Sequence, residues 1–306
     1  MSVPVAAPAA HASGTPGVQE SREPQRVQAA PVAPPGWPAD WRPPRIALGV
    51  TGTDTGVGKT VVAAALAAAF TAALEGQPGR VRGPGEAGAA RASGGNGGSA
   101  GARTPVGVLK PAETGVPDGS VPPDAALLRA AAGGAVPLGD VCPFVFTEPV
   151  APLVAAERAG RVIPLHALDA AYVRVAGGRA AVIVEGAGGL LVPVADGVGY
   201  DTLFARWGLA VVIVAANRLG VLNHAALTVR AAEAAGLRVA AVVLNTITAA
   251  PPDVAESTNL AALRRLLPRH KVLTFPSVGD PHHIPALAEA AVASGLLHAL
   301  FQPPAS

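Results

Sequence analysis

The chain has 306 residues, of which 50% are hydrophobic and 14% are charged, and its formal net charge is +2. This composition supports a sizeable buried core in one large domain or two small ones. The scattered positive charges form no basic stripe, which argues against a nucleic-acid-binding protein, and no segment demands a membrane helix. The single cysteine, Cys142, excludes internal disulfides and cysteine-rich metal sites and fits a reducing compartment, so we expect a cytoplasmic protein.

Two segments lack the pattern of a folded core. Residues 1–44 are rich in Pro, Ala and Gln, show no periodicity and lack the basic start and apolar centre of a signal peptide. We expect a disordered extension there, followed by one domain over residues 45–302. Residues 76–104 are dominated by Gly, Ala, Ser and Arg, which predicts a flexible surface insertion within that domain.

Between these segments, short apolar runs alternate with Ala- and Leu-rich helical runs. Strands that are apolar throughout are buried on both faces, and their alternation with helices indicates parallel pairing with right-handed crossovers. We therefore predict an α/β fold with a single doubly wound, mostly parallel sheet and helices on both faces. The expected strands are Ile46–Thr51, Val106–Lys110, Ala181–Glu185, Ala210–Ala215, Val239–Asn245 and Val272–Pro276. The expected helices are Lys59–Glu75, Asp124–Ala132, Pro164–Ala176, Leu222–Ala235, Leu260–Leu267 and Ile284–Phe301.

The first strand runs into the string TGTDTGVGKT, residues 51–60, just before the first helix. Glycines allow a sharp turn, and the helix start supplies unpaired N–H groups and a positive dipole end, which together favour a phosphate-binding loop. Lys59 would reach the β- and γ-phosphates of a nucleotide, and the Thr60 hydroxyl would bind Mg²⁺. Five residues, instead of the usual four, separate Gly52 from the Gly-Lys pair. A glycine-rich turn with an incidental lysine is the alternative.

Polar residues also follow the later strands, at the edge where open parallel sheets bind ligands. Lys110, in GVLKPAETG, could project into the same crevice or be a surface lysine. Asp124 follows two prolines and could cap a helix or contact a metal. Glu185 precedes Gly-Ala-Gly-Gly, and a carboxylate buried there without a metal or partner would be costly, which favours a site role.

Two more strand ends offer backbone and amide groups. A helix start in ANRLGVLNHAALT could hold a carboxylate through the N–H groups of Gly220, Val221, Leu222 and Asn223. Asn245 could serve the edge of adenine or a local turn. We expect His224 and the pair His282–His283 to take no part in chemistry.

Five strings in this order, TGTDTGVGKT, KPAETG, EGAGG, GVLN and LNT, resemble the dethiobiotin synthetases of biotin biosynthesis over residues 45–302. The resemblance implies an ATP-dependent cyclo-ligase that converts 7,8-diaminononanoate and CO₂ to dethiobiotin, releasing ADP and phosphate. The reaction would pass through a carbamate and a carbamic-phosphoric mixed anhydride. The resemblance also implies Mg²⁺ and a homodimer with the substrate site at the subunit interface.

The same resemblance assigns roles to individual residues. Lys59 and Lys110 would be the catalytic lysines, and Mg²⁺ would be held by Thr60, Asp124 and Glu185. The nucleotide would contact Thr55, Gly56, Val57, Gly58, Lys59, Thr60, Val61, Asp124, Glu185, Gly186, Ala187, Gly188, Asn245, Thr246 and Pro276. The substrate would contact Thr114, Gly188, Gly220, Val221, Leu222 and Asn223.

Two other classes of protein share the predicted fold class. A nucleotide-switch ATPase of the chromosome-partitioning kind predicts a basic surface and an additional lysine near the start of the phosphate loop, but residues 51–55 contain none. An amide-forming cobyrinate-type synthase predicts a second, glutamine-hydrolysing domain, and too little chain follows residue 250 for one.

Overall fold

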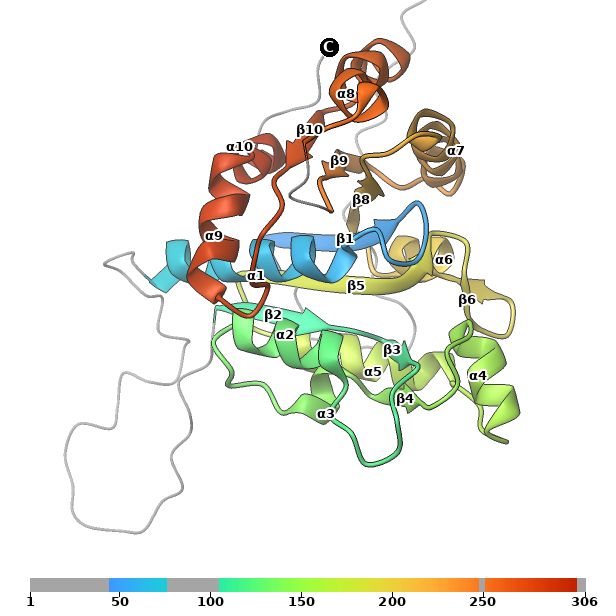
Figure 1. Ribbon diagram of the computed structural model, residues 1–306. Helices are drawn as coiled ribbons and strands as arrows, with labels where there is room; N and C mark the ends of the chain where they lie inside the picture. Colours follow the sequence, from blue (N-terminus) through green and yellow to red (C-terminus); the bar gives the residue numbers. More distant parts are fainter. Residues whose placement is uncertain (1–43, 76–104, 248–250, 302–306) are drawn as a thin grey trace, which may run out of the picture. The chain divides into compact units, whose positions relative to one another are not determined.

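The computed structural model describes residues 44–75, 105–247 and 251–301 (Figure 1). The predicted N-terminal extension, apart from Pro44, and the predicted insertion 76–104 lie outside the described residues. Within the described part, no helix is long and apolar enough to cross a membrane.

A six-stranded sheet in the order β10-β9-β8-β1-β5-β2 forms the centre of the domain, and all its neighbouring strands are parallel. Its strands are β1 (Ile46–Gly52), β2 (Val106–Leu109), β5 (Ala181–Gly189), β8 (Ala210–Ala216), β9 (Val239–Asn245) and β10 (Val272–Phe275). The predicted fold class and its six strands are thus confirmed. The largest difference is at β5, which extends four residues beyond Glu185 because its glycines continue the pairing to Gly52 of β1.

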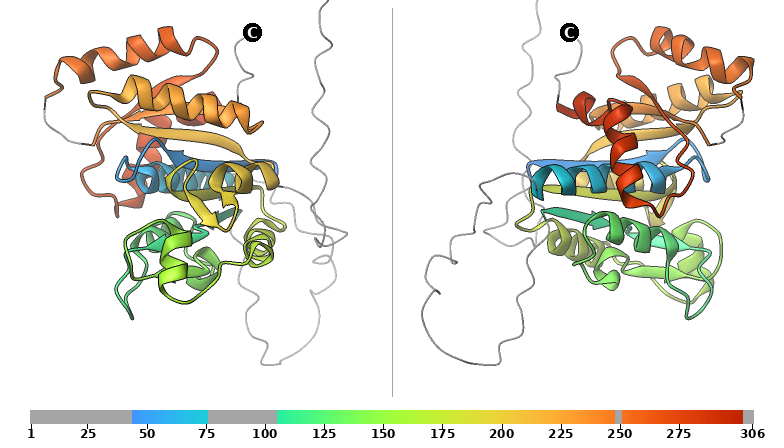
Figure 2. Two further views of the ribbon diagram at one scale, coloured as in Figure 1. Left: turned by 90° about the vertical axis from the view of Figure 1, so that its right-hand side faces the viewer. Right: turned by 60° about the vertical axis from the view of Figure 1, so that its left-hand side comes forward.

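Helices cover both faces of this sheet. α1 (Lys59–Glu75) packs on β1 and β5 and is flanked by α2 (Pro123–Ala131) and α9 (Ile284–Ala293), as the right-hand view of Figure 2 shows for α9. α5 (Leu165–Ala176) and α6 (Tyr200–Arg206) cover the other face, joined by stacking of Tyr172 on Trp207. α7 (Val221–Ala234) packs on β8 and β9, and α8 (Val254–Leu266) packs on β10.

Glycines in the strands let α6 approach the sheet closely. A methyl group at Gly49 of β1 would lie 2.7 Å from the Phe204 ring, so only glycine fits between the strand and this helix. Because side chains alternate across a strand, Leu48 and Val50 point to the opposite face, where α1 lies. The side chains of β1 thus pack against α1 on one face, while the other face meets α6.

Two predicted helices differ from the structure. α8 begins at Val254, six residues earlier than expected, because Asp253 and Glu256 form a capping box that starts it. The expected helix Ile284–Phe301 is two helices, α9 and α10 (Leu296–Phe301), because Gly295 adopts a left-handed conformation with φ 73°.

The sequence analysis missed several short elements. They are β3 (Ala112–Thr114), β4 (Phe144–Phe146), β6 (Pro193–Ala195), β7 (Val198–Gly199), α3 (Leu138–Val141), α4 (Pro152–Arg158) and α6. None exceeds seven residues, so each is too short to show a hydrophobic period. β3 pairs with β4 beyond the end of β2, which places the string KPAETG next to the carboxyl edge of the main sheet.

Candidate active site

The segment between β1 and α1 forms a tight loop around the Lys59 side chain. Gly56 and Gly58 adopt left-handed conformations, with φ 73° and 87°, and a methyl group at Gly52 would lie 2.7 Å from the Asp54 carbonyl oxygen. The Lys59 Nζ atom donates a hydrogen bond of 3.0 Å to that same carbonyl, and Lys59 is only 7% exposed. The phosphate-binding role of this loop stays a prediction.

Strand register brings Lys110 and Glu185 together. Leu109 of β2 pairs with Val184 of β5, so the next residue of each strand, Lys110 and Glu185, lies at the same level of the carboxyl edge. Gly186 faces Tyr200 of α6, and alternation therefore turns Glu185 towards the face that holds α1 and α2.

Four side chains form one hydrogen-bonded group, which we call the charged cluster: Thr60, Lys110, Asp124 and Glu185. The Lys110 ammonium donates to Glu185 Oε1 at 2.6 Å and to Asp124 Oδ2 at 2.7 Å. The Thr60 hydroxyl donates to the same Glu185 oxygen at 2.8 Å. Lys110 is 3% exposed and Glu185 is fully buried, so these charges depend on one another for compensation.

The pKa values of the two lysines at this edge are shifted in opposite directions. Burial lowers the pKa of Lys59, and the nearby Lys110 ammonium lowers it further, although Glu185 opposes both effects. Burial alone would also lower the pKa of Lys110, but the carboxylates of Glu185 and Asp124 outweigh it and raise that pKa. Lys59 precedes Thr60, whose hydroxyl shares Glu185 Oε1 with the Lys110 ammonium, so the two lysines lie at the same end of the sheet.

The carboxylates of the charged cluster also differ. Burial would raise the pKa of Asp124, but the Lys110 ammonium outweighs burial and lowers it. Burial raises the pKa of Glu185 in spite of the same ammonium. Among the described residues, the second oxygen of Glu185, Oε2, has no hydrogen-bond partner although it is buried. An unpaired carboxylate oxygen beside a hydroxyl and a second carboxylate suits a hard cation such as Mg²⁺.

Other predicted nucleotide residues lie against the phosphate loop. The Asn245 amide donates to the Val57 carbonyl oxygen at 3.0 Å. A methyl group at Gly188 would lie 3.6 Å from the Thr55 hydroxyl oxygen, so the EGAGG string runs beside the loop. The predicted positions Val61 and Ala187 lie next to the charged cluster in sequence, on α1 and β5. Thr246 donates its backbone N–H to the Phe275 carbonyl, immediately before the exposed Pro276.

The remaining predicted substrate residues are not joined to the charged cluster. Thr114 ends β3, and Gly220, with φ 92°, precedes α7, whose first residues are Val221, Leu222 and Asn223. Among the described residues, no hydrogen bond or ion pair links these five positions to the charged cluster. The segment before α7 does contact the region of the phosphate loop, through an exposed pair of Arg218 with Asp54, 3.6 Å apart.

Asp124 does not cap α2, so that interpretation is wrong. Pro122 is the N-cap residue, and Asp124 lies within the first turn with its carboxylate on Lys110. The backbone N–H of Asp124 instead donates a hydrogen bond to the carboxylate of Glu113, a buried residue that the sequence analysis did not single out. The position of Glu113 within KPAETG could have marked it as a candidate, but the short strand β3 that orients its side chain was not predicted.

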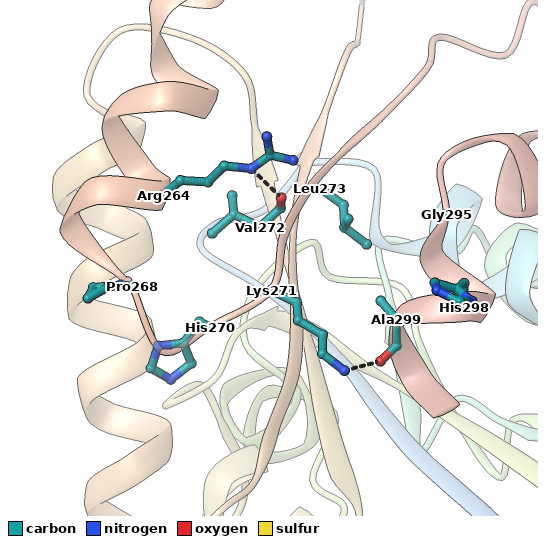
Figure 3. A pocket seen from close by; sticks show the side chains of 9 residues that line it. All are labelled: Arg264, Pro268, His270, Lys271, Val272, Leu273, Gly295, His298 and Ala299. Carbon is teal, nitrogen blue, oxygen red and sulfur yellow. Dashed lines mark hydrogen bonds between the residues drawn. The ribbon is translucent and has the colours of Figure 1, made fainter. Parts of the chain in front are cut away.

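A cavity of about 480 Å³ lies elsewhere, between α8, the start of β10 and α10 (Figure 3). Its lining includes Arg264, whose side chain donates to the Val272 carbonyl, and Lys271, whose ammonium donates to the Ala299 carbonyl. No residue of the predicted site lines it. Ligands of open parallel sheets bind beyond the carboxyl ends of the strands, which favours the charged cluster over this cavity.

Comparison with known proteins identifies the family. The chain is 42% identical to an ATP-dependent dethiobiotin synthetase of Anaeromyxobacter dehalogenans over 229 residues, covering 75% of this chain and 89% of the relative. It is 35% identical to the enzyme of the same name from Ralstonia nicotianae, covering 78% and 92%, and 32% identical to that from Bacillus subtilis, covering 71% and 81%. The chain belongs to the dethiobiotin synthetase family.

Other comparisons are coarser. A family model described as an AAA domain matches residues 100–283, which begins after the phosphate loop. Two solved structures have TM-scores of 0.40 and 0.43: an ADP complex of a nucleotide-binding protein from Archaeoglobus fulgidus and a ParA family ATPase from Chlorobium tepidum. They are 15% and 11% identical and cover 85% and 83% of this chain, and 89% and 98% of their own lengths. The dethiobiotin synthetase relatives confirm the resemblance found in the sequence.

Proposed function

We propose that this protein closes a cyclic urea on 7,8-diaminononanoate, using CO₂ and ATP and releasing dethiobiotin, ADP and phosphate. The single observation that carries the proposal is the hydrogen bond from Thr60, which follows Lys59, to the Glu185 oxygen that also binds Lys110. Two anions, a carbamate and a nucleotide, can approach each other only where cations screen their repulsion. Membership of the dethiobiotin synthetase family supports the choice of these substrates.

The nucleotide half of the proposed site uses the phosphate loop. The backbone N–H groups from Thr55 to Val61 and the Lys59 ammonium would hold the phosphates, as helix starts with glycine-rich loops do. Asn245, Thr246 and Pro276 would lie beside adenine. The Asn245 amide already contacts the Val57 carbonyl, so its remaining oxygen and second N–H are the groups left for the base.

The residues present fit a magnesium ion at the charged cluster. Thr60, Asp124 and Glu185 would hold it, because they supply a hydroxyl, a carboxylate and the unpaired buried oxygen of Glu185. No group of three or more His, Cys, Asp or Glu side chains suited to a metal occurs in the part of the chain that the structure describes. Nucleotide oxygens and water would therefore complete the coordination, as is usual for Mg²⁺. When bound, Mg²⁺ would neutralise charge on the phosphates.

The reaction needs no covalent intermediate with the protein. One substrate amine takes up CO₂ as a carbamate, whose oxygen attacks the γ-phosphorus while ADP leaves. The second amine then attacks the carbon of the mixed anhydride, and phosphate leaves with the bonding electrons. The protein would orient the two anions and hold the Lys110 ammonium at the carbamate. Turning this ammonium from Asp124 to the carbamate exchanges one anionic partner for another, so its charge stays paired.

The substrate half of the proposed site extends beyond the charged cluster. Thr114 and Gly188 would contact the carbamate end of the substrate. The N–H groups of Gly220 to Asn223 would hold its carboxylate at the positive end of α7. We propose that this helix start serves the charged cluster of the second subunit of a homodimer, as the resemblance to the dethiobiotin synthetases implies.

Turnover tests the proposed reaction directly. Purified protein with Mg²⁺, bicarbonate and ATP should release ADP only when 7,8-diaminononanoate is added, and dethiobiotin should form in equal amount. The cytoplasmic, membrane-free protein that we expect needs no lipid in this assay. Release of ADP at the same rate without the diamine would remove the synthetase assignment.

Mixing of two inactive variants tests the homodimer. Gly220→Asp places a negative charge at the proposed carboxylate site, and Gly220→Asn is its neutral control with the same tolerance of positive φ. If α7 acts on the partner's cluster, mixed dimers of Gly220→Asp with Lys110→Ala contain one intact site and restore about a quarter of the wild-type rate. No restoration with proven mixed dimers would place both elements in one subunit.

A further inference from the structure

The start of α2 has no capping side chain of its own. Pro122 is the N-cap residue and Pro123 begins the helix, and neither carries an N–H group. The first available donors are therefore the N–H groups of Asp124 and Ala125. A single carboxylate from another element takes both of them. Glu113 Oε1 accepts from Asp124 at 2.9 Å, and Glu113 Oε2 accepts from Ala125 at 3.0 Å.

Glu113 is well suited to hold this helix start. It is only 4% exposed, so water competes little for its oxygen atoms. A carboxylate at a helix N-terminus meets both the unpaired N–H groups and the positive end of the dipole. Burial raises the pKa of Glu113, and the two N–H donors oppose that shift by stabilising the charged form.

The same short segment holds Asp124 in two ways. Lys110 binds the Asp124 carboxylate at 2.7 Å, and Glu113, three residues later, binds the Asp124 backbone. β3 fixes the direction of Glu113 through its pairing with β4. Two residues of KPAETG therefore hold Asp124, one through its backbone and one through its side chain. Its neighbours in the sequence are prolines and an alanine, whose side chains cannot form hydrogen bonds to it.

We propose that Glu113 is a positioning residue that fixes Asp124 for binding of the Mg²⁺–nucleotide complex. The inference rests on the proposed function to the extent that Asp124 is taken as a metal ligand. Partners that orient a ligand affect metal affinity nearly as much as the ligands themselves, because a displaced carboxylate binds a small octahedral ion poorly. Glu113 would thus act through Asp124 without touching nucleotide or substrate.

Glu113→Gln tests this role with little change of shape. The amide nitrogen cannot accept a hydrogen bond, so one of the two bonds to α2 is lost. We expect the Mg²⁺ concentration for half-maximal ADP binding, measured by calorimetry without turnover, to rise about tenfold. The Mg²⁺ requirement of turnover should rise equally, while the rate at saturating Mg²⁺ stays close to that of the unaltered protein.

Two control variants separate positioning from helix capping. Glu256→Ala removes the side-chain bond at the start of α8, where Glu256 accepts from the Asp253 N–H at 2.9 Å. It should lower the melting temperature slightly and leave the Mg²⁺ requirement unchanged. Asp124→Asn should raise the Mg²⁺ requirement at least as much as Glu113→Gln does.

The outcomes are distinct. A Glu113→Gln protein with a lower melting temperature and an unchanged Mg²⁺ requirement would overturn the proposal, since Glu113 would then be only a cap. An unchanged Mg²⁺ requirement in Asp124→Asn would also overturn the proposal. In either case, dethiobiotin formation by the unaltered protein would still support the proposed function. If Glu113→Gln does not fold, Glu113→Asp, which keeps the charge on a shorter stem, undergoes the same measurements with the same two outcomes.

Discussion

Lys59 and Lys110 lie at the same edge of the sheet, yet their surroundings are opposite. Lys59 donates to one neutral carbonyl oxygen, whereas Lys110 lies between two carboxylates. An ammonium with a neutral partner gains strongly when phosphates arrive, because it exchanges a dipole for an anion. An ammonium that is already paired gains little from binding and matters only when it is redirected to a reacting group. We therefore propose that Lys59 serves mainly nucleotide binding and Lys110 serves turnover.

Lys59→Ala should have the largest effect. Both ATP binding and turnover should fall by about 100-fold or more, because the phosphates lose a buried cationic donor. Calorimetry with ATP and initial rates of ADP release measure the two losses. Lys271→Ala is the matched control, since Lys271 contacts the Ala299 carbonyl at the opposite end of β10 and should leave both unchanged. ATP binding of normal strength in Lys59→Ala would contradict the comparison.

Lys110→Ala should abolish turnover, because the carbamate loses its cation, and at saturating Mg²⁺ it should leave ATP affinity within about threefold of its normal value. The variant leaves Glu185 buried without a counter-ion, which should cost about 3–5 kcal/mol of folding free energy. Thermal unfolding must therefore accompany the kinetics, to establish that the folded form is assayed. Normal turnover in folded Lys110→Ala protein would exclude Lys110 from the chemistry.

A smaller effect is expected from pH. Burial lowers the pKa of Lys59 from the ordinary 10.5, and a lysine binds phosphate only when protonated. ATP affinity should be full below that lowered pKa and decline as the pH rises through it, before ordinary lysines titrate. The pKa of Lys110 is raised, so its ion pair persists through the same range. Measurement of ATP affinity from neutral to alkaline pH tests this, and a flat profile up to the ordinary lysine range would contradict it.

The sequence predicted the fold and most of this edge because both follow from local signals. Apolar runs marked all six strands, and the strings at their ends marked Lys59, Lys110 and Glu185. What escaped prediction depends on tertiary contacts. Asp124 looks like a helix cap in the sequence, and only the fold shows that Glu113 of the unpredicted β3 takes its N–H. The break between α9 and α10 depends on the left-handed conformation of Gly295, which a single glycine in the sequence does not predict.

The position of the insertion has a practical consequence. Residues 76–104 leave from the end of α1 and rejoin at Pro105, whose carbonyl accepts from Ala180 and Ala181 at the start of β5. α1 has 17 residues, so its length of about 25 Å separates this junction from the phosphate loop. We expect a fluorophore or affinity tag attached at this junction, next to the end of α1 or to Pro105, to leave turnover unchanged.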